Sequence, residues 1–136
     1  MARIERFEDI EAWKKRRELR RAICHCSRNG AFARDFGLRE QIRRSAVSVT
    51  SNIAEGFERG GNKEFIQFLA NSEGSCGELR DQLCAALDEQ YISTDQFNTL
   101  CGQAVEVSRM ISGLMRYLKQ SEIRGAKYKP DESAKL

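Results

Sequence analysis

The sequence predicts an all-α domain, an antiparallel up-down-up-down four-helix bundle. Four long stretches repeat apolar residues every three or four positions, as amphipathic helices do. The connections between them are short and carry glycines or helix-capping residues. The one proline of the 136 residues, Pro130, lies near the end, so no proline interrupts the interior of a long helix. Short connections place consecutive helices antiparallel, which gives the bundle.

The first helix is expected over residues 9–28. It ends at Asn29-Gly30, because glycine accepts the left-handed conformation that closes a helix. Arg16 and Arg20 project from the same side as its loose apolar stripe, at 100° per residue. That stripe consists of Trp13, Leu19, Ile23 and Cys26.

The second helix follows a short loop over residues 30–35, and Asp35 is placed to cap it. It ends at Gly60-Gly61. Its apolar face comprises Leu38, Ile42, Ala46, Val49, Ile53 and Phe57. Beside that face runs a polar stripe made of Ser45, Ser48, Asn52, Glu55 and Arg59.

The third helix is expected to begin with Asn62 as its cap. Its apolar pattern is the cleanest of the four: Phe65, Phe68, Leu69, Ser72, Cys76, Leu79, Leu83, Ala86 and Leu87. Gly74, Ser75 and Gly77 form a thin patch on this helix, where another backbone could approach closely.

The fourth helix follows Ser93 and Gln96, which have the spacing of a capping box. Its apolar pattern stops after about Gln120. We therefore expect the bundle over residues 1–120 and a flexible polar tail over residues 121–136.

Composition suits a soluble globular chain, with 40% hydrophobic and 32% charged residues. We expect a cytoplasmic protein, since the sequence has no signal peptide and no apolar run long enough to cross a membrane. The five cysteines are an odd number without CxxC spacing, which favours reduced thiols. Cys24 and Cys26 would point to different faces of a helix, a poor start for a tetrahedral metal site. No phosphate-binding loop or dinucleotide motif is visible, and neither a metal nor a cofactor is expected.

The charge is divided unevenly. Residues 1–61 carry 14 Lys and Arg against 9 Asp and Glu, whereas residues 62–120 carry 5 against 8. Such a basic half favours an acidic partner, either nucleic acid or the acidic half of another copy. The candidate nucleic-acid-binding residues are Lys14, Lys15, Arg16, Arg17, Arg20, Arg21, Arg39, Arg43 and Arg44.

A solvated helix face with local pairs such as Glu11–Lys15 is the simpler interpretation of these charges. Their density argues against it, because six of the eight residues from Lys14 to Arg21 are basic. No RNA-recognition motif or DNA-binding signature is present. Binding should therefore involve the phosphate backbone, depend on salt and select sequence weakly.

The polar stripe of the second helix has three interpretations. It could be a solvated surface, or a helix–helix or subunit seam in which small side chains permit close approach and Glu55 is paired. It could also contact a ligand or nucleic acid. A catalytic role would make Glu55 an acid or base and Ser48 a nucleophile, but no histidine is placed beside them and His25 is the only one in the chain. We expect a structural or assembly role and no enzymatic activity.

Several segments resemble the family of proteins encoded by intervening sequences of bacterial 23S ribosomal RNA genes, the S23-like proteins. The accessory variability determinant proteins of diversity-generating retroelements belong to the same superfamily. The segments that carry the resemblance lie within about residues 4–120: FEDIEAW at 7–13, FGLREQIRRSAVS at 36–48, SNIAEGFERG at 51–60 and GSCGEL at 74–79.

This resemblance implies a four-helix protomer that assembles into a ring-like homopentamer, a nucleic-acid-binding or scaffolding role, and no enzymatic activity. The chain departs from the family pattern at Arg16 and Arg20, where relatives often have small residues, and at Cys24, where they often have an aromatic one.

We therefore expect a non-enzymatic, self-assembling protein that presents a basic surface. Its partner would be structured RNA or a nucleic-acid enzyme such as a reverse transcriptase. The alternative is a purely structural oligomeric scaffold for a protein partner, without nucleic-acid binding.

Overall fold

The computed structural model describes residues 4–123, and that part of the chain contains helices and no strand. The four long helices are α1 (Glu11–Cys26), α3 (Phe36–Arg59), α4 (Asn62–Asp88) and α5 (Thr94–Ile123). A short 3-10 helix, η1 (Phe7–Asp9), precedes α1, and a five-residue helix, α2 (Gly30–Arg34), connects α1 to α3. The all-α four-helix prediction is confirmed.

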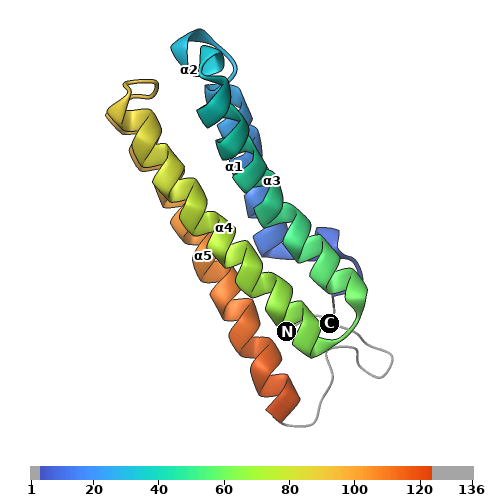
Figure 1. Cartoon of the computed structure of the whole chain (residues 1–136). Helices are drawn as coiled ribbons and strands as arrows, with labels where there is room; N and C mark the ends of the chain where they lie inside the picture. Colours follow the sequence, from blue (N-terminus) through green and yellow to red (C-terminus); the bar gives the residue numbers. More distant parts are fainter. Residues whose placement is uncertain (1–3, 124–136) are drawn as a thin grey trace.

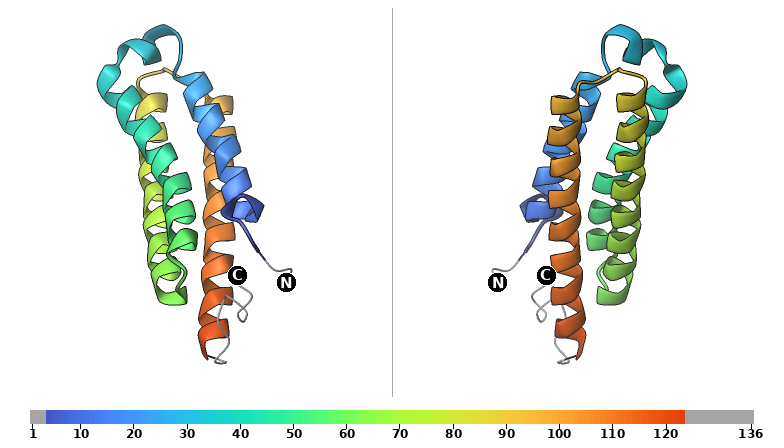
Figure 2. Two further views of the ribbon diagram at one scale, coloured as in Figure 1. Left: turned by 90° about the vertical axis from the view of Figure 1, so that its right-hand side faces the viewer. Right: turned by 90° about the vertical axis from the view of Figure 1, so that its left-hand side faces the viewer.

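The long helices form a bundle in which each packs against two others (Figure 1). Helix α3 contacts α1 and α4, while α5 contacts α4 and α1, so α1 lies diagonally across from α4. Helix α1 is much the shortest of the four, and its N-terminal end is extended by η1, which packs on α1 and α3 (Figure 2). The α1–α3 connection and the α4–α5 turn lie at the same end of the bundle.

Two predicted helix starts are confirmed in atomic detail. The Asp35 carboxylate accepts a hydrogen bond from the Leu38 amide at 3.1 Å and so caps α3. At α5, the Ser93 amide donates to Gln96 Oε1 at 2.8 Å, and the Gln96 amide donates to Ser93 Oγ at 3.0 Å. This reciprocal pair is the expected capping box.

The start of α4 differs from the prediction. Gly61 occupies the cap position, and Asn62 is the first residue of the helix. The Asn62 amide donates instead to the Leu118 carbonyl at 3.0 Å, which joins the start of α4 to the far end of α5. The predicted cap is wrong, and the partner of the Asn62 side chain lies 56 positions away.

The predicted loop over residues 30–35 is mostly helical. Phe32 is 1% exposed, and its ring stacks on that of Tyr91 with centroids 5.3 Å apart. Anchoring this aromatic side chain holds the segment against the α4–α5 turn as a single helical turn, α2. Helix α1 is shorter than expected by two residues at each end. Residues 121–123 continue α5, and the rest of the predicted tail lies outside the described residues.

The core is mainly apolar, and the most extensive helix contact is between α3 and α4. A side-chain carbon at Gly56 would lie 2.7 Å from the Phe68 Cβ, so glycine is what permits this approach. By contrast, Gly74 and Gly77 are exposed, and nothing lies within 4 Å of a side-chain carbon placed at either. The prediction that they mark a close backbone approach is wrong for this protomer. Within residues 4–123, no helix is both long and apolar enough to cross a membrane.

Candidate nucleic-acid interface

Arg16 does not belong to the basic surface, contrary to the prediction. Its side chain is 0% exposed and lies inside the bundle. Both terminal guanidinium nitrogens donate to the Ala12 carbonyl at 2.9 Å, Nη2 also reaches the Trp13 carbonyl at 3.3 Å, and Nε has no partner. Burial lowers the pKa of Arg16 to about 10, while the nearby Cys76 thiol acts in the opposite direction. The physical reason is helical phase, since Arg16 shares the face of buried Leu19 and Ile23.

Two further candidate arginines brace the corner that joins α1, α2 and α3. Arg43 Nε donates to the buried Ser27 Oγ at 2.9 Å, and its Nη2 donates to the Cys24 carbonyl at 3.3 Å. Arg39 Nη1 donates to the Ala33 carbonyl at 3.0 Å. Both side chains are half-buried, so their first role is to hold the chain path at this end of the bundle.

The two candidate lysines have weak ionic partners. Lys14 lies 3.2 Å from Glu11, and Lys15 lies 4.0 Å from Glu106 on α5. All four side chains are substantially exposed, and ion pairs of this kind contribute about 0–1 kcal/mol and are screened by salt. The lysines can therefore exchange these partners for phosphates.

The remaining candidate arginines are accessible. Arg20 is partly exposed, Arg21 and Arg44 are exposed, and none of these three makes an ion pair or hydrogen bond within residues 4–123. The Arg17 guanidinium lies over the Trp13 ring, 5.9 Å from its centroid, and is exposed on the outer side. These four positions keep the predicted property, an available positive charge.

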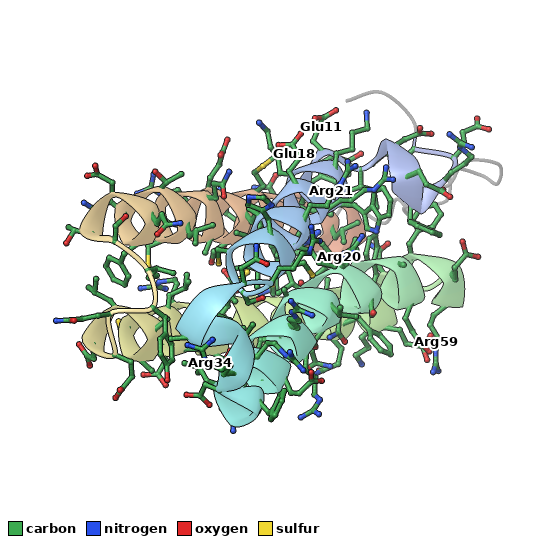
Figure 3. The ribbon with its side chains drawn as sticks, turned by 90° about the horizontal axis from the view of Figure 1, so that it is seen from above. Glu11, Glu18, Arg20, Arg21, Arg34 and Arg59 are labelled. Atoms are coloured by element: carbon green, nitrogen blue, oxygen red, sulfur yellow. The ribbon has the colours of Figure 1, made fainter. Side chains whose placement is uncertain are left out.

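Two arginines outside the predicted set join them. Arg28 follows the last turn of α1 and Arg34 ends α2; both are exposed and neither has an ionic partner in the described part of the chain. Figure 3 shows Arg20 and Arg21 on α1 and Arg34 on α2. The signal in the sequence was their position between two basic runs, which the α1–α3 corner brings to one end of the bundle.

A groove lies between the C-terminal half of α1 and the first two turns of α5. Its volume is about 830 Å³. Helix α1 and the residues after it contribute three arginines, a histidine and small side chains, and α5 contributes one carboxylate, two uncharged polar side chains and a leucine. The lining residues are Arg20, Arg21, Ala22, Cys24, His25, Cys26, Arg28, Asp95, Gln96, Thr99 and Leu100.

The predicted polar stripe divides into an inner and an outer part. Ser45 is buried, and the Ser48 hydroxyl lies 2.9 Å from that of Ser75 on α4. The Asn52 amide donates to the Ser48 carbonyl at 2.9 Å and to its hydroxyl at 3.1 Å. Ser48 therefore lies at the α3–α4 seam within the protomer, and Asn52 is bonded to it from the next turn of α3.

The outer part of the stripe is Glu55 and Arg59. Arg59 Nη2 donates to Glu55 Oε2 at 3.0 Å, and both side chains are about half exposed. They border a shallow hollow of about 490 Å³ on the outer side of α3, together with Ser51, Ala54 and Glu58. Glu55 is thus paired with arginine as expected, but at the surface. Within the described residues, no contact joins Glu55 to Ser48, so the geometry offers no catalytic pair.

A polar layer that the sequence did not reveal crosses the middle of the bundle. Glu73 of α4 accepts hydrogen bonds from the Ser108 and Ser112 hydroxyls of α5. On the other side of α4, the buried Ser72 hydroxyl donates to the Val49 carbonyl of α3 at 2.7 Å. Cys76, one turn along, is buried, and this raises the pKa of its thiol to about 11. Such layers specify helix register, because a slip would leave their members unpaired.

Comparison with known proteins identifies the family. Residues 8–113 match the model of the 23S rRNA-intervening sequence protein family. The chain belongs to this family. The match includes the whole of α1, α3 and α4 and the α1–α3 corner, and it ends within α5.

A solved structure of the same kind shares the fold. It is the 1.70 Å crystal structure of a protein with unknown function from the S23 ribosomal protein family of Bacteroides thetaiotaomicron VPI-5482. The TM-score is 0.71 at 20% sequence identity, with 76% of this chain and 97% of that one covered. No curated protein matches the chain. Neither the family description nor that of the neighbour names an enzymatic activity.

Arg16 and Arg20 lie four residues apart on helix α1, but the structure places their side chains in different surroundings. Arg16 is taken into the core, whereas Arg20 lines the α1–α5 groove. Cys24 also lines that groove, and its carbonyl accepts a hydrogen bond from Arg43 Nη2. Among residues 4–123, no three His, Cys, Asp or Glu side chains gather as metal ligands would.

Proposed function

We propose that this member of the 23S rRNA-intervening sequence protein family is a non-enzymatic, self-assembling scaffold that binds structured RNA in the cytoplasm. One observation carries the proposal. Between α1 and the first half of α3, six exposed or partly exposed arginines lack any anionic partner within residues 4–123: Arg17, Arg20, Arg21, Arg28, Arg34 and Arg44.

Uncompensated arginines favour phosphate for a physical reason. A guanidinium already engaged with a carboxylate would have to exchange that partner, whereas a free one gains a bidentate contact and releases counterions from the RNA. No base-reading motif accompanies these arginines. Contacts to the phosphate backbone should therefore dominate, with a steep dependence on salt and little sequence selectivity.

Self-assembly would multiply this charge. Support for self-assembly comes from the outer side of α3. There, Phe36 is 65% exposed and Val47 is 46% exposed, which are high values for large apolar side chains. The shallow hollow beside Ser51 and Ala54 continues this face toward the α3 C-terminus. A ring-like homopentamer, as the family resemblance implies, would repeat the arginine cluster five times.

The deciding experiment is light-scattering mass of the purified protein, with and without a structured RNA, at low and high salt. We expect an oligomer that gains the mass of RNA at low salt and loses it at high salt. The test variant replaces Arg20, Arg21, Arg28 and Arg34 with Gln. The matched control replaces four exposed basic residues of the other half of the chain with Gln: Lys63, Arg80, Arg109 and Lys119.

Both variants lose the same formal charge, so the comparison isolates the position of the charges. The test variant should lose RNA binding, and the control should keep most of it. In the test variant, the slope of log affinity against log salt concentration should fall by about one for each phosphate contact removed. Equal losses in the two variants would mean that only net charge matters and would contradict a specific surface.

A protein scaffold without nucleic-acid binding is the second candidate. The exposed Phe36 and Val47 side chains favour it, because apolar surface also suits a protein partner. An oligomer that ignores RNA at every salt concentration would support this candidate, with a nucleic-acid enzyme such as a reverse transcriptase as one possible partner class.

A further inference from the structure

The α1–α5 groove combines two kinds of surface that a nucleotide requires. Arg20, Arg21 and Arg28 bring positive charge to it from the α1 side. Among its lining residues, Asp95 is the single acidic one, so three arginines outweigh one carboxylate. Anionic groups are therefore favoured inside the groove, and a phosphate is the natural ligand for a guanidinium.

The rest of the lining is suited to a base. Ala22, Cys26 and Leu100 supply an apolar floor, and Gln96 and Thr99 supply hydrogen-bonding groups from α5. Thr99 is exposed and its hydroxyl makes no hydrogen bond within residues 4–123. Gln96 Oε1 is occupied by the capping box, which leaves its amide hydrogens free to donate.

Size and shape favour an unpaired nucleotide over a duplex. The volume of about 830 Å³ is large enough for a small organic ligand, and the groove is open to solvent. In an A-form duplex the bases are stacked inside and only the backbone and groove edges are presented, whereas unpaired bases can be splayed into a pocket.

We infer that the groove between α1 and α5 binds an unpaired nucleotide of a single-stranded RNA segment. Its phosphate lies on Arg21 and Arg28, and its base covers the apolar floor next to Thr99. This inference rests on the proposed RNA-binding function and adds to it, since the general basic surface alone would not distinguish paired from unpaired RNA.

The test fills the groove without changing its charge. Thr99→Trp places a large ring at an exposed position that lines the groove, and Asn98→Trp places the same ring at the neighbouring exposed position that does not. The probes are a single-stranded RNA of about 12 nucleotides, within the range that small binding surfaces cover, and the blunt duplex of the same sequence.

We expect Thr99→Trp to weaken binding of the single strand about 10-fold, because the ring occupies the volume in which the base would lie. Its duplex affinity should stay within about twofold, and Asn98→Trp should match the parent protein on both probes. As a second variant, Asp95→Asn removes the single carboxylate of the groove and should tighten single-strand binding at low salt, whereas Asp88→Asn, outside the groove, should not.

The outcomes distinguish binding in the groove from binding to the general basic surface. Unchanged single-strand affinity in Thr99→Trp and in Asp95→Asn, with normal RNA binding by the parent protein, would overturn the groove assignment and leave the basic surface intact. An equal loss for single strand and duplex would also overturn it. Absence of binding to either probe by the parent protein at low salt would overturn both the proposed function and the groove.

Discussion

Replacing the buried Arg16 with methionine should make the protein more stable. The side chain is fully buried with no carboxylate partner, and its Nε has no hydrogen-bond partner. Methionine has a similar length and no charge, and it adapts to irregular core spaces. A change that removes this arginine therefore removes a cost of folding while keeping most of the packing.

The magnitude follows from the pKa and from the hydrogen bonds that are lost. Burial lowers the pKa of Arg16 to about 10, which at about 1.4 kcal/mol per pKa unit corresponds to a penalty of about 3 kcal/mol for the charged form. The folded state has the lower pKa, so this penalty is fully present at every pH below about 10 and declines only as the pH rises above it.

The hydrogen bonds of the guanidinium offset part of that penalty. They end on the Ala12 and Trp13 carbonyls, which also accept bonds within α1, so removing the guanidinium leaves neither carbonyl without a donor. Replacing a buried charged group with an apolar one of similar volume stabilises proteins by about 1–4 kcal/mol in favourable cases. We expect a gain of about 2 kcal/mol for Arg16→Met, or roughly 6–10 °C in Tm for a chain of this size.

Urea unfolding followed by circular dichroism at fixed protein concentration would measure this change. Arg109→Met is the control, because Arg109 is exposed in the middle of α5, and its stability should stay within about 0.5 kcal/mol of the parent. A loss of more than about 1 kcal/mol in Arg16→Met would refute the reasoning, because it would show that the guanidinium makes a net favourable contribution in the core.

Three further predictions concern packing and buried polar groups. Gly56→Ala should cost about 1–3 kcal/mol in urea unfolding, because its new carbon would lie 2.7 Å from the Phe68 Cβ; an unchanged midpoint would contradict the close α3–α4 approach. Ser72→Ala should cost about 0.5–1.5 kcal/mol through loss of its 2.7 Å bond to α3, and a more stable variant would argue against that bond. At pH 8 a thiol reagent should label exposed Cys84 and spare Cys76 until the chain unfolds, because burial raises the pKa of the Cys76 thiol to about 11 and thiolate is the reactive form. Labelling of both cysteines at one rate, checked by mass spectrometry, would refute this.

The helices were predictable from sequence because their signals are local. The Asp35 cap and the Ser93–Gln96 capping box depend on residues three positions apart, and the structure has both. Asn62 gives the same local signal, yet its amide bonds to a carbonyl of α5 that only the folded bundle brings near. Local rules identify such a residue as polar and needing a partner, and tertiary packing chooses the partner.

The candidate site was harder to predict because the fate of a basic residue depends on the helices around it. The sequence placed Arg16 and Arg20 on one side of the first helix. Their directions around the helix axis differ slightly, and this difference puts Arg16 in the core and Arg20 at the α1–α5 groove. Arg43 looked equally available, and it is engaged with Ser27 and Cys24 from a helix earlier in the chain. Charge density indicated which end of the molecule is basic, and only the packing showed which charges are free.

Some of these arginines hold the chain path and others are free to bind RNA, and this difference connects the fold to the proposed function. Arg39 and Arg43 fix the path of the chain between α1 and α3, and Arg28 and Arg34 both lie on that path. Arg28 also lines the α1–α5 groove. Loss of Arg43 should therefore lower stability, and it should also weaken RNA binding because Arg28 and Arg34 would be displaced. Loss of Arg28 should weaken RNA binding and leave stability unchanged. Measuring affinity and unfolding together in Arg43→Gln and Arg28→Gln would distinguish a positioning residue from a contact residue, and a pure affinity loss in both would contradict the bracing role.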